Sequence, residues 1–348
     1  MTIDQLVNFA RSKNASDIHL TVGAPTAVRI NGELKKFDMK DDDTNKLILS
    51  MLSADQERKL GENIDLDFSF SCSTGARQRV NVYHQNGGKL AAAIRLLNEH
   101  VPSFKDIMLP NAAIELTKEM KGLILVTGPT GSGKSTTLAT MVDYINQGRA
   151  CHILTIEDPV EYIYEPKKAT IHQREIGTDV SDFNSALRSG LRENPDVILV
   201  GEMRDYETIR LAITAAETGH LVLGTLHTTG AAQTINRIID VFPSEEQNQI
   251  RSQLSGNLRG VISQMLVPCI SQERGRVAAF EILINTDACA NNIRTEKVHM
   301  IEQVMQSSAG IGMRVMNESL KRLTRDNIIT RDIALLYSPD KEELKKML

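Results

Sequence analysis

One nine-residue string, GPTGSGKST at residues 128–136, restricts the possible folds of this chain more than any other feature. It directly follows the apolar run GLILV and directly precedes a helical pattern, which is the strand, loop and helix context that a phosphate-binding loop requires. Glycines in such a loop let backbone N–H groups converge on phosphate oxygens, and the helix N-terminus adds the positive end of its dipole. The string therefore predicts an α/β fold with a nucleotide phosphate site.

Every residue of this loop is expected to contribute to nucleotide binding. Lys134 would reach the β- and γ-phosphates, and the hydroxyl of Ser135 would bind Mg²⁺, so ATP and Mg²⁺ are the expected cofactors. A degenerate loop that binds nucleotide without cleaving it is the alternative. The predicted binding residues are Gly128, Pro129, Thr130, Gly131, Ser132, Gly133, Lys134, Ser135 and Thr136.

A second apolar run, in NPDVILVGEMRD at residues 194–205, ends beside carboxylates. The end of such a strand is where a P-loop enzyme keeps the acids that serve its Mg²⁺ and its attacking water. Gly201 stands where the usual acid would be, so Glu202 is predicted to polarise the water. A glutamate at a strand end is more often a solvated loop residue, and its position downstream of the phosphate loop favours catalysis.

The string TIEDPVE, at residues 155–161, ends the preceding predicted strand with acidic side chains. If Gly201 leaves the metal short of an acid, Glu157 and Asp158 are the nearest candidates to complete the site through water, because Mg²⁺ usually keeps several waters. An acidic loop alone is usually a solvated turn. Its place at a neighbouring strand end favours a functional role.

Two histidines bracket the strand predicted at residues 220–226. His227 stands at its carboxyl end, where ligands gather in open α/β sheets, and is predicted to sense the γ-phosphate. His220 stands at its beginning. For His220, a function and a structural role in the core or an interface both remain open.

Arginines supply a further set of candidates. Arg77 and Arg79 are two apart in a predicted strand and therefore share a face, and Arg95 lies in the last predicted strand of the first domain. A solvated sheet face is the alternative reading, but a ring-shaped motor needs cations from outside its P-loop domain to neutralise charge on the γ-phosphate. These three are therefore predicted to act in trans, with Arg188 and Arg192 as a second candidate pair.

The hydrophobic pattern changes along the chain and predicts two domains. Residues 1–98 read as a small α+β domain, residues 99–111 as a linker with two prolines, and residues 112–348 as an α/β domain with a helical C-terminal region. In the first domain we predict helices at 2–14 and 43–60, strands at 17–22, 26–30, 65–71, 77–84 and 89–97, and a hairpin turn at Asn31-Gly32. In the second we predict strands at 122–126, 152–156, 197–200 and 220–226, helices at 134–147, 181–194 and 205–218, and mostly helix after 230 with one strand at 276–284.

Composition argues against several functional classes. The formal net charge is -4 and aromatic residues make up 4% with no tryptophan, which disfavours a nucleic-acid partner. The four cysteines are scattered with no CxxC pair, so neither a zinc site nor a redox dithiol is predicted. No apolar run is long enough for a membrane span, and the polar start is unlike a signal peptide. We therefore expect a cytoplasmic protein.

Taken in order, GPTGSGKST, TIEDPVE, RENPDVILVGEMRD and ETGHLVLGTLHTTGA resemble the Walker A motif, Asp box, atypical Walker B motif and His box of the secretion ATPase superfamily. Three further strings resemble its branch of type IV pilus retraction ATPases, the twitching-motility proteins: ASDIHL, ARQRVNVYHQ and ACANNIRTEKVHMIEQVMQ. The resemblance covers nearly the whole chain. One departure is Thr228-Thr229 after His227, where Thr-Asn is usual, and it leaves interface details open.

The resemblance implies a PAS-like N-terminal domain, a RecA-like ATPase core and a hexameric ring, peripheral to the membrane, beneath an inner-membrane pilus platform protein. It implies that Glu202 is the catalytic carboxylate, that Glu157 belongs to the Asp box, and that Arg77, Arg79 and Arg95 complete the site. The segment around Arg294 is similar to a helical motif associated with retraction.

Retraction is favoured because related secretion and extension ATPases commonly carry a further N-terminal domain and a four-cysteine zinc segment, and this sequence shows neither. The alternatives are a pilus assembly or type II secretion ATPase, and a nucleotide-gated binding module without sustained turnover. A DNA motor is a third.

Overall fold

The computed structural model describes residues 1–30, 33–37, 41–62, 64–73, 75–97, 100–271 and 275–348. By its internal contacts the chain divides into two compact units. One consists of Met1–His100 with Pro159–Ile163, and the other of Val101–Asp158 with Tyr164–Leu348. Among the described residues, no helix is both long and apolar enough to cross a membrane.

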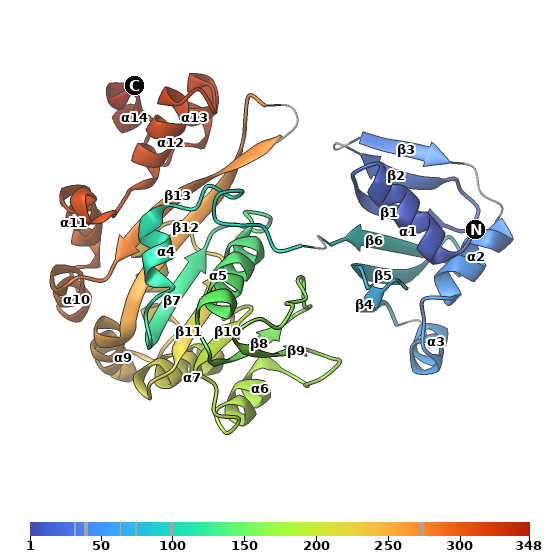
Figure 1. Ribbon diagram of the computed structural model, residues 1–348, viewed down its shortest axis with the longest axis horizontal. Coiled ribbons are helices and arrows are strands. Elements are labelled where there is room, and N and C mark those ends of the chain that lie inside the picture. Colours follow the sequence, from blue (N-terminus) through green and yellow to red (C-terminus); the bar gives the residue numbers. More distant parts are fainter. Residues whose placement is uncertain (31–32, 38–40, 63, 74, 98–99, 272–274) are drawn as a thin grey trace. The chain divides into compact units, whose positions relative to one another are not determined.

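The first unit is a six-stranded antiparallel sheet with helices packed on it, in the strand order β3-β2-β1-β6-β5-β4 (Figure 1). Its core is apolar and includes Val7 from the first helix and Ile18, Val80 and Ile94 from the sheet. This is the small α+β, PAS-like domain that was expected. Its elements are α1 (Ile3–Ser12), β1 (Ala15–Thr21), β2 (Thr26–Ile30), β3 (Glu33–Phe37), α2 (Asp41–Leu49), α3 (Ala54–Gly61), β4 (Leu66–Ser71), β5 (Arg77–Gln85) and β6 (Lys89–Leu96).

Two details of the first unit differ from prediction. The helix predicted at 43–60 is two helices, because Ser53 caps the start of α3 and forms a reciprocal capping box with Gln56. Strand β3 was missed because ELKKF is exposed along its whole length, so no alternation of buried and polar residues marks it. Such charged edge strands resist pairing with other chains. The predicted turn Asn31-Gly32 lies outside the described residues.

The second unit contains a seven-stranded sheet in the order β13-β12-β7-β11-β10-β8-β9 (Figure 1). The strands from β12 to β9 run parallel, and only β13 is antiparallel to its neighbour. This is the RecA-like α/β core that was expected. The strands are β7 (Gly122–Thr127), β8 (His152–Glu157), β9 (Thr170–Glu175), β10 (Val197–Val200), β11 (Leu221–Leu226), β12 (Leu258–Pro268) and β13 (Arg276–Ile284).

Helices cover both faces of this sheet, so its central strands are apolar on both sides. In β7, Leu123 and Leu125 join a core built with α7 to α10, whereas Ile124 and Val126 alternate to the other face, where α5 packs. The helices are α4 (Asn111–Leu116), α5 (Lys134–Gly148), α6 (Phe183–Gly190), α7 (Tyr206–Glu217), α8 (Ala231–Asp240), α9 (Ser244–Asn257), α10 (Asp287–Arg294), α11 (Ile301–Ser307), α12 (Met316–Arg325), α13 (Arg331–Tyr337) and α14 (Lys341–Met347).

The prediction that the chain is mostly helical after residue 230, with one strand, was wrong for β12. This strand pairs with β7 on one side and β13 on the other, and most of it is buried on both faces, so its residues show no period-two pattern. Strand β9 was also missed, because TIHQRE is a polar strand at the edge of the sheet. Both omissions concern strands that lack an alternation of buried and polar residues.

Candidate active site

The phosphate-binding loop joins β7 to α5 at the carboxyl edge of the parallel strands. Gly133 is left-handed at φ 88° and ends the loop, so α5 begins at Lys134. The ammonium of Lys134 donates to the carbonyl oxygens of Gly128 at 2.9 Å and Pro129 at 3.1 Å. Lys134 therefore lies folded across the loop in which backbone N–H groups would receive a phosphate.

Gly128 is required by geometry as well as by conformation. Its φ is 144°, and a Cβ at this position would lie 2.2 Å from the carbonyl oxygen of Gln264 in β12. Any side chain would push the start of the loop away from the neighbouring strand. The absence of a side chain at Gly128 thus allows the start of the loop to pack against the backbone of β12.

His227 joins the loop to Glu202. Its Nε2 lies 3.0 Å from Oε1 of Glu202, and its Nδ1 lies 3.4 Å from Oγ1 of Thr130 and 3.5 Å from Nζ of Lys134. An ionised carboxylate can only accept and an ammonium can only donate. These contacts therefore fit the tautomer in which Nε2 carries the proton.

Glu202 follows β10 and is held by two neighbours. Arg204, which the sequence analysis did not single out, donates from Nε to Oε1 of Glu202 at 2.6 Å. Burial raises the pKa of Glu202, but hydrogen bonds and charge from Arg204 and His227 outweigh burial, so its pKa lies below the ordinary value. The carboxylate is therefore kept in the charged form that can accept a proton.

Gly201 explains how the acidic loop after β8 comes close to Glu202. The N–H of Gly201 donates to the carbonyl of Ile156 at 2.8 Å, and a Cβ there would lie 3.2 Å from the Cα of Glu157. Glu157 therefore ends its strand directly beside the segment that carries Glu202. Asp158 is exposed, and the pKa of Arg204 is raised mainly by its hydrogen bond to Glu202, with a smaller contribution from the charge of Asp158.

A magnesium ion would find few protein ligands here. Among the residues that the structure describes, no group of three or more His, Cys, Asp or Glu side chains could hold a metal alone. Ser135, Glu157 and Asp158 supply the oxygen donors that Mg²⁺ prefers, and this ion commonly takes its remaining ligands from phosphate and water. The donor chemistry therefore fits a magnesium ion that arrives with nucleotide.

The predicted trans arginines form one group on the first unit. Arg79 and Arg95 are directly opposite each other across β5 and β6. Arg79 makes two hydrogen bonds to Asp67, at 3.1 and 2.6 Å, and Nε of Arg95 lies 3.3 Å from Asp17. Arg77 shares the solvent-facing side of β5. All three thus lie on one face of this sheet, and their role in trans stays a prediction.

The other candidates have local partners. Arg188 forms an ion pair with Glu207 and so connects α6 to α7, while Arg192 is exposed after α6. His220 lies at the amino end of β11, opposite to His227, and its Nδ1 lies 2.9 Å from the carbonyl of Ala215. Neither finding brings these residues to the phosphate loop.

Two polar residues of β12 support the loop and were not predicted. Nε2 of Gln264 donates to the carbonyl of Ser132 at 2.7 Å, and its Oε1 accepts from Oγ1 of Thr137 at 2.8 Å. Ser263 accepts from Oγ1 of Thr127 at 3.0 Å and from the N–H of Gly230 at 2.8 Å. No motif marks these residues, because the sequence predicted helix in this segment.

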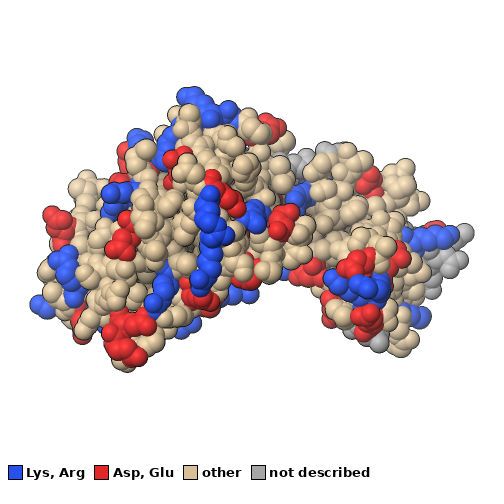
Figure 2. Space-filling model, turned by 90° about the horizontal axis from the view of Figure 1, so that it is seen from below, with Lys and Arg blue, Asp and Glu red and all other residues tan. Residues whose placement is uncertain are grey.

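Charged side chains are mixed on the surface drawn in Figure 2. Lys and Arg are interspersed with Asp and Glu over that face, and the described residues there show no continuous basic band. The absence of a nucleic-acid partner remains a prediction. All four cysteines are among the described residues and are free.

The phosphate loop between a buried parallel strand and a helix, with Glu202 and His227 at adjacent strand ends, defines a P-loop nucleoside triphosphatase. Comparison with known families narrows this class. The family model of type II/IV secretion system proteins matches residues 1–335. The chain therefore belongs to the type II/IV secretion system protein family.

Similar proteins span almost the whole chain. The chain is 46% identical over 337 residues to the type IV pilus retraction ATPase PilT of Pseudomonas aeruginosa, covering 96% of this chain and 97% of that one. It is 44% identical to a twitching motility protein of Neisseria gonorrhoeae, covering 91% and 85%. Among solved structures, the pilus retraction motor PilT with bound ADP matches with a TM-score of 0.93 and 48% identity, covering 99% of both chains.

Proposed function

We propose that this protein is an ATP-hydrolysing motor subunit that powers type IV pilus retraction and therefore twitching motility. The observation that carries the proposal is the contact chain from Lys134 through His227 to Glu202. It lies in a chain that matches a retraction ATPase from end to end. The protein would work as a hexameric ring at the cytoplasmic face of the inner membrane, against a platform protein.

The arrangement supports a direct mechanism for hydrolysis. The phosphate loop and Lys134 would bind the β- and γ-phosphates of ATP. Glu202 would accept a proton from water as the water oxygen bonds to the γ-phosphorus, and the bond from that phosphorus to the bridging oxygen of ADP would break. His227 would sense whether the γ-phosphate is bound, and its contact with Glu202 would connect that phosphate to the catalytic carboxylate. Ser135, Glu157 and Asp158 would hold Mg²⁺, which neutralises phosphate charge.

Motion would follow from the two-unit organisation. We propose domains at residues 1–98 and 112–348 with a linker at 99–111. Residues 98 and 99, where the first domain meets the linker, lie outside the described part. Arg77, Arg79 and Arg95 would contact the nucleotide of the neighbouring subunit and be released after hydrolysis. The linker would then act as a hinge, so that a local chemical step becomes a rigid-body displacement in the ring.

Phosphate release by purified protein with ATP and Mg²⁺ tests the catalytic part. We expect Glu202→Gln to bind ATP but to lose about 100-fold or more in turnover, because the residue would no longer accept the proton. Glu245→Gln, at an exposed position in the first turn of α9, is the matched control and should keep wild-type turnover. Normal turnover by Glu202→Gln would remove Glu202 from the mechanism.

A pilus phenotype tests the direction of the motor. Deletion of the gene should leave cells with excess pili that do not retract, and the wild-type gene but not the Glu202→Gln gene should restore twitching. Cells without any pili after deletion would contradict retraction and indicate an assembly ATPase.

A further inference from the structure

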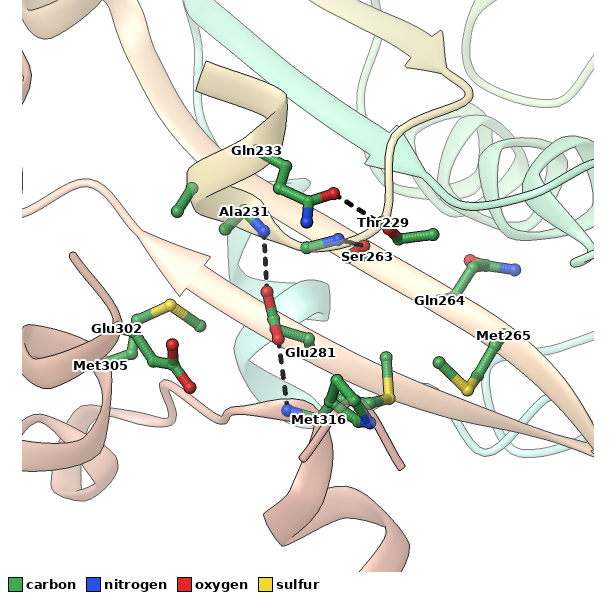
Figure 3. Close-up of a pocket in the computed structure, with 13 residues that line it drawn as sticks. Thr229, Ala231, Gln233, Ser263, Gln264, Met265, Glu281, Glu302, Met305 and Met316 are labelled. Atoms are coloured by element: carbon green, nitrogen blue, oxygen red, sulfur yellow. Dashed lines mark hydrogen bonds between the residues drawn. The ribbon is translucent and has the colours of Figure 1, made fainter. Parts of the chain in front are cut away.

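Glu281 is a carboxylate that the catalytic proposal does not use. It lies in β13 on the wall of a cavity of about 210 Å³ that β12, β13, α8, α11 and α12 surround (Figure 3). In Figure 3 its two oxygens point in opposite directions, one toward Ala231 and one toward Met316. A single side chain therefore bridges two helices.

Both bridged groups are backbone N–H groups at helix starts. Oε1 of Glu281 accepts from Ala231 at 2.7 Å, and Oε2 accepts from Met316 at 3.2 Å. Ala231 is the first residue of α8 and Met316 is the first residue of α12, and each helix has ten residues. The residues before them, Gly230 and Val315, provide no side-chain cap. Glu281 thus caps two helices whose own sequences lack a cap.

Two opposing effects act on the charge of the Glu281 carboxylate. Two helix N-termini present partial positive charge to one anion, and hydrogen bonds from N–H to a carboxylate are stronger than neutral ones. Burial and the nearby Glu302 act against the charge, and burial dominates, so the pKa of Glu281 is raised despite the two N–H donors. The two helix starts therefore offset part of the energetic cost of a buried charge at this position.

One of the two helices begins next to the catalytic histidine. Only three residues separate His227 from Ala231. Ser263 of β12 holds the turn between His227 and Ala231, because its hydroxyl accepts a hydrogen bond from the N–H of Gly230. Ser263 is also the residue directly opposite Glu281 in the pairing of β12 with β13. Because Ser263 also contacts Thr127, the turn after His227 and the residue before the phosphate loop share one support.

The other helix belongs to the C-terminal layer. Leu320 and Leu323 of α12 pack in a core with Val277 and Ala279 of β13 and with residues of α13 and α14. Through Glu281, the position of this layer is thus connected to the turn that follows His227.

We propose that Glu281 is a positioning residue for ATP hydrolysis, which holds the His227 turn in register with the C-terminal helices by capping α8 and α12 together. The proposal rests on the proposed ATPase function. Glu281 touches neither nucleotide nor water in this role. Its loss should therefore affect the placement of His227 and Glu202 more than the binding of the phosphates by the loop.

The decisive variant is Glu281→Gln, which keeps the size but loses the charge and turns one acceptor into a donor that faces an N–H. We expect kcat to fall about 10-fold or more, while KM for ATP changes less than about 2-fold. Turnover is to be expressed per nucleotide-binding site, so that misfolded protein is not counted. Glu302→Gln, in the same cavity wall but exposed, should keep kcat within about 2-fold.

A second variant removes one hydrogen bond without touching the carboxylate. Ala231→Pro deletes the N–H that Oε1 accepts, at the first helical position, where proline is best tolerated. It should lower kcat in the same way. Wild-type kcat in folded, nucleotide-binding Glu281→Gln or Ala231→Pro protein would overturn the proposal.

Hydrogen exchange separates this proposal from the proposed function. In Glu281→Gln the first turns of α8 and α12 should exchange faster together, whereas Glu302→Gln should leave both unchanged. This readout stands even if the wild-type protein releases no phosphate, an outcome that would contradict only the ATPase function. Unchanged exchange in either helix would contradict the shared cap.

Discussion

At the scale of single residues, the site depends on the two side chains that contact the carboxylate of Glu202. The carboxylate is in contact with Arg204 on one side and His227 on the other, and His227 in turn reaches Thr130 of the phosphate loop. A proton acceptor must be charged and yet able to release its partners when water arrives. Arg204, with 69% of its side chain exposed, can leave more easily than His227, of which 44% is exposed.

The pH dependence of hydrolysis tests the role of Arg204. The pKa of Glu202 is lowered in the wild type, so the base stays charged as pH falls toward the ordinary carboxyl range. Burial raises the pKa of Glu202, and Arg204→Gln removes the largest influence that lowers it and leaves only that of His227, so Glu202 takes up its proton at higher pH. We expect the acid limb of kcat/KM to move to higher pH than in the wild type.

The matched control is Arg237→Gln, at an exposed position on α8. It should keep the wild-type pH profile. Identical acid limbs in Arg204→Gln and wild-type protein would show that Arg204 does not set the charge of Glu202.

At the scale of elements, β12 organises the site although it carries no motif. It pairs with β7, and its Gln264 binds both the carbonyl of Ser132 and the hydroxyl of Thr137 on the two sides of the loop end. Gln264 is buried, with 2% of its surface exposed. If its side chain were removed, water could not replace the hydrogen bonds that Ser132 and Thr137 would lose. The shape of the phosphate loop is thus partly a property of its neighbouring strand.

Truncation of this side chain should weaken both the fold and nucleotide binding. Gln264→Ala leaves two buried polar groups without their partner, so we expect a loss of about 1–3 kcal/mol in the free energy of unfolding. ATP affinity should fall about 10-fold, because the loop is less ordered before binding. Denaturant unfolding and nucleotide titration measure the two effects.

Gln253→Ala is the control, since that glutamine bonds to Glu217 at the surface of α9. It should change stability by less than about 0.5 kcal/mol. Nucleotide affinity in Gln264→Ala equal to that of the control would show that β12 does not shape the loop.

At the scale of the whole molecule, the catalytic parts lie in one unit and the candidate trans arginines in the other. The arginines already have carboxylate partners in their own sheet, Asp67 for Arg79 and Asp17 for Arg95. Both pairs are largely exposed on the arginine side, so each contributes little to stability and can exchange its carboxylate for a phosphate. If these arginines act in trans, the loss of their ion pairs would therefore lower the stability of the fold only slightly.

Mixing two inactive proteins tests this arrangement. Lys134→Ala should lose nucleotide binding, and Arg95→Ala should bind ATP but hydrolyse it at least 10-fold more slowly. If a subunit supplies its arginines to its neighbour, a mixed ring contains some sites with an intact loop and an intact arginine. We expect the mixture to release phosphate faster than the sum of the two proteins alone.

The control mixture combines Lys134→Ala with Glu202→Gln. These residues act in the same unit, so no mixed site regains both and no recovery is expected. Absence of recovery in the arginine mixture as well would place Arg95 outside the neighbouring site.

The sequence by itself determined the local features. The strand bounds of β10 and β13 agree with prediction, because short apolar runs bounded by polar residues are visible without knowledge of their partners. The phosphate loop, Glu202 and His227 could be proposed as site residues for the same reason, since each stands at the end of such a run. Their separate strand ends then meet because parallel strands end at one edge of the sheet.

Only the tertiary structure decided the supports of the site. Gln264 and Ser263 act on residues more than 120 positions away in sequence, and Glu281 joins two helix starts that lie on either side of it in the chain. Hydrogen bonds between such distant segments leave no periodicity in the sequence, because periodicity records which face is buried and not which polar group is met there. The candidate reacting residues can therefore be predicted from the chain, whereas the groups that hold them in place become visible only once the strands are paired.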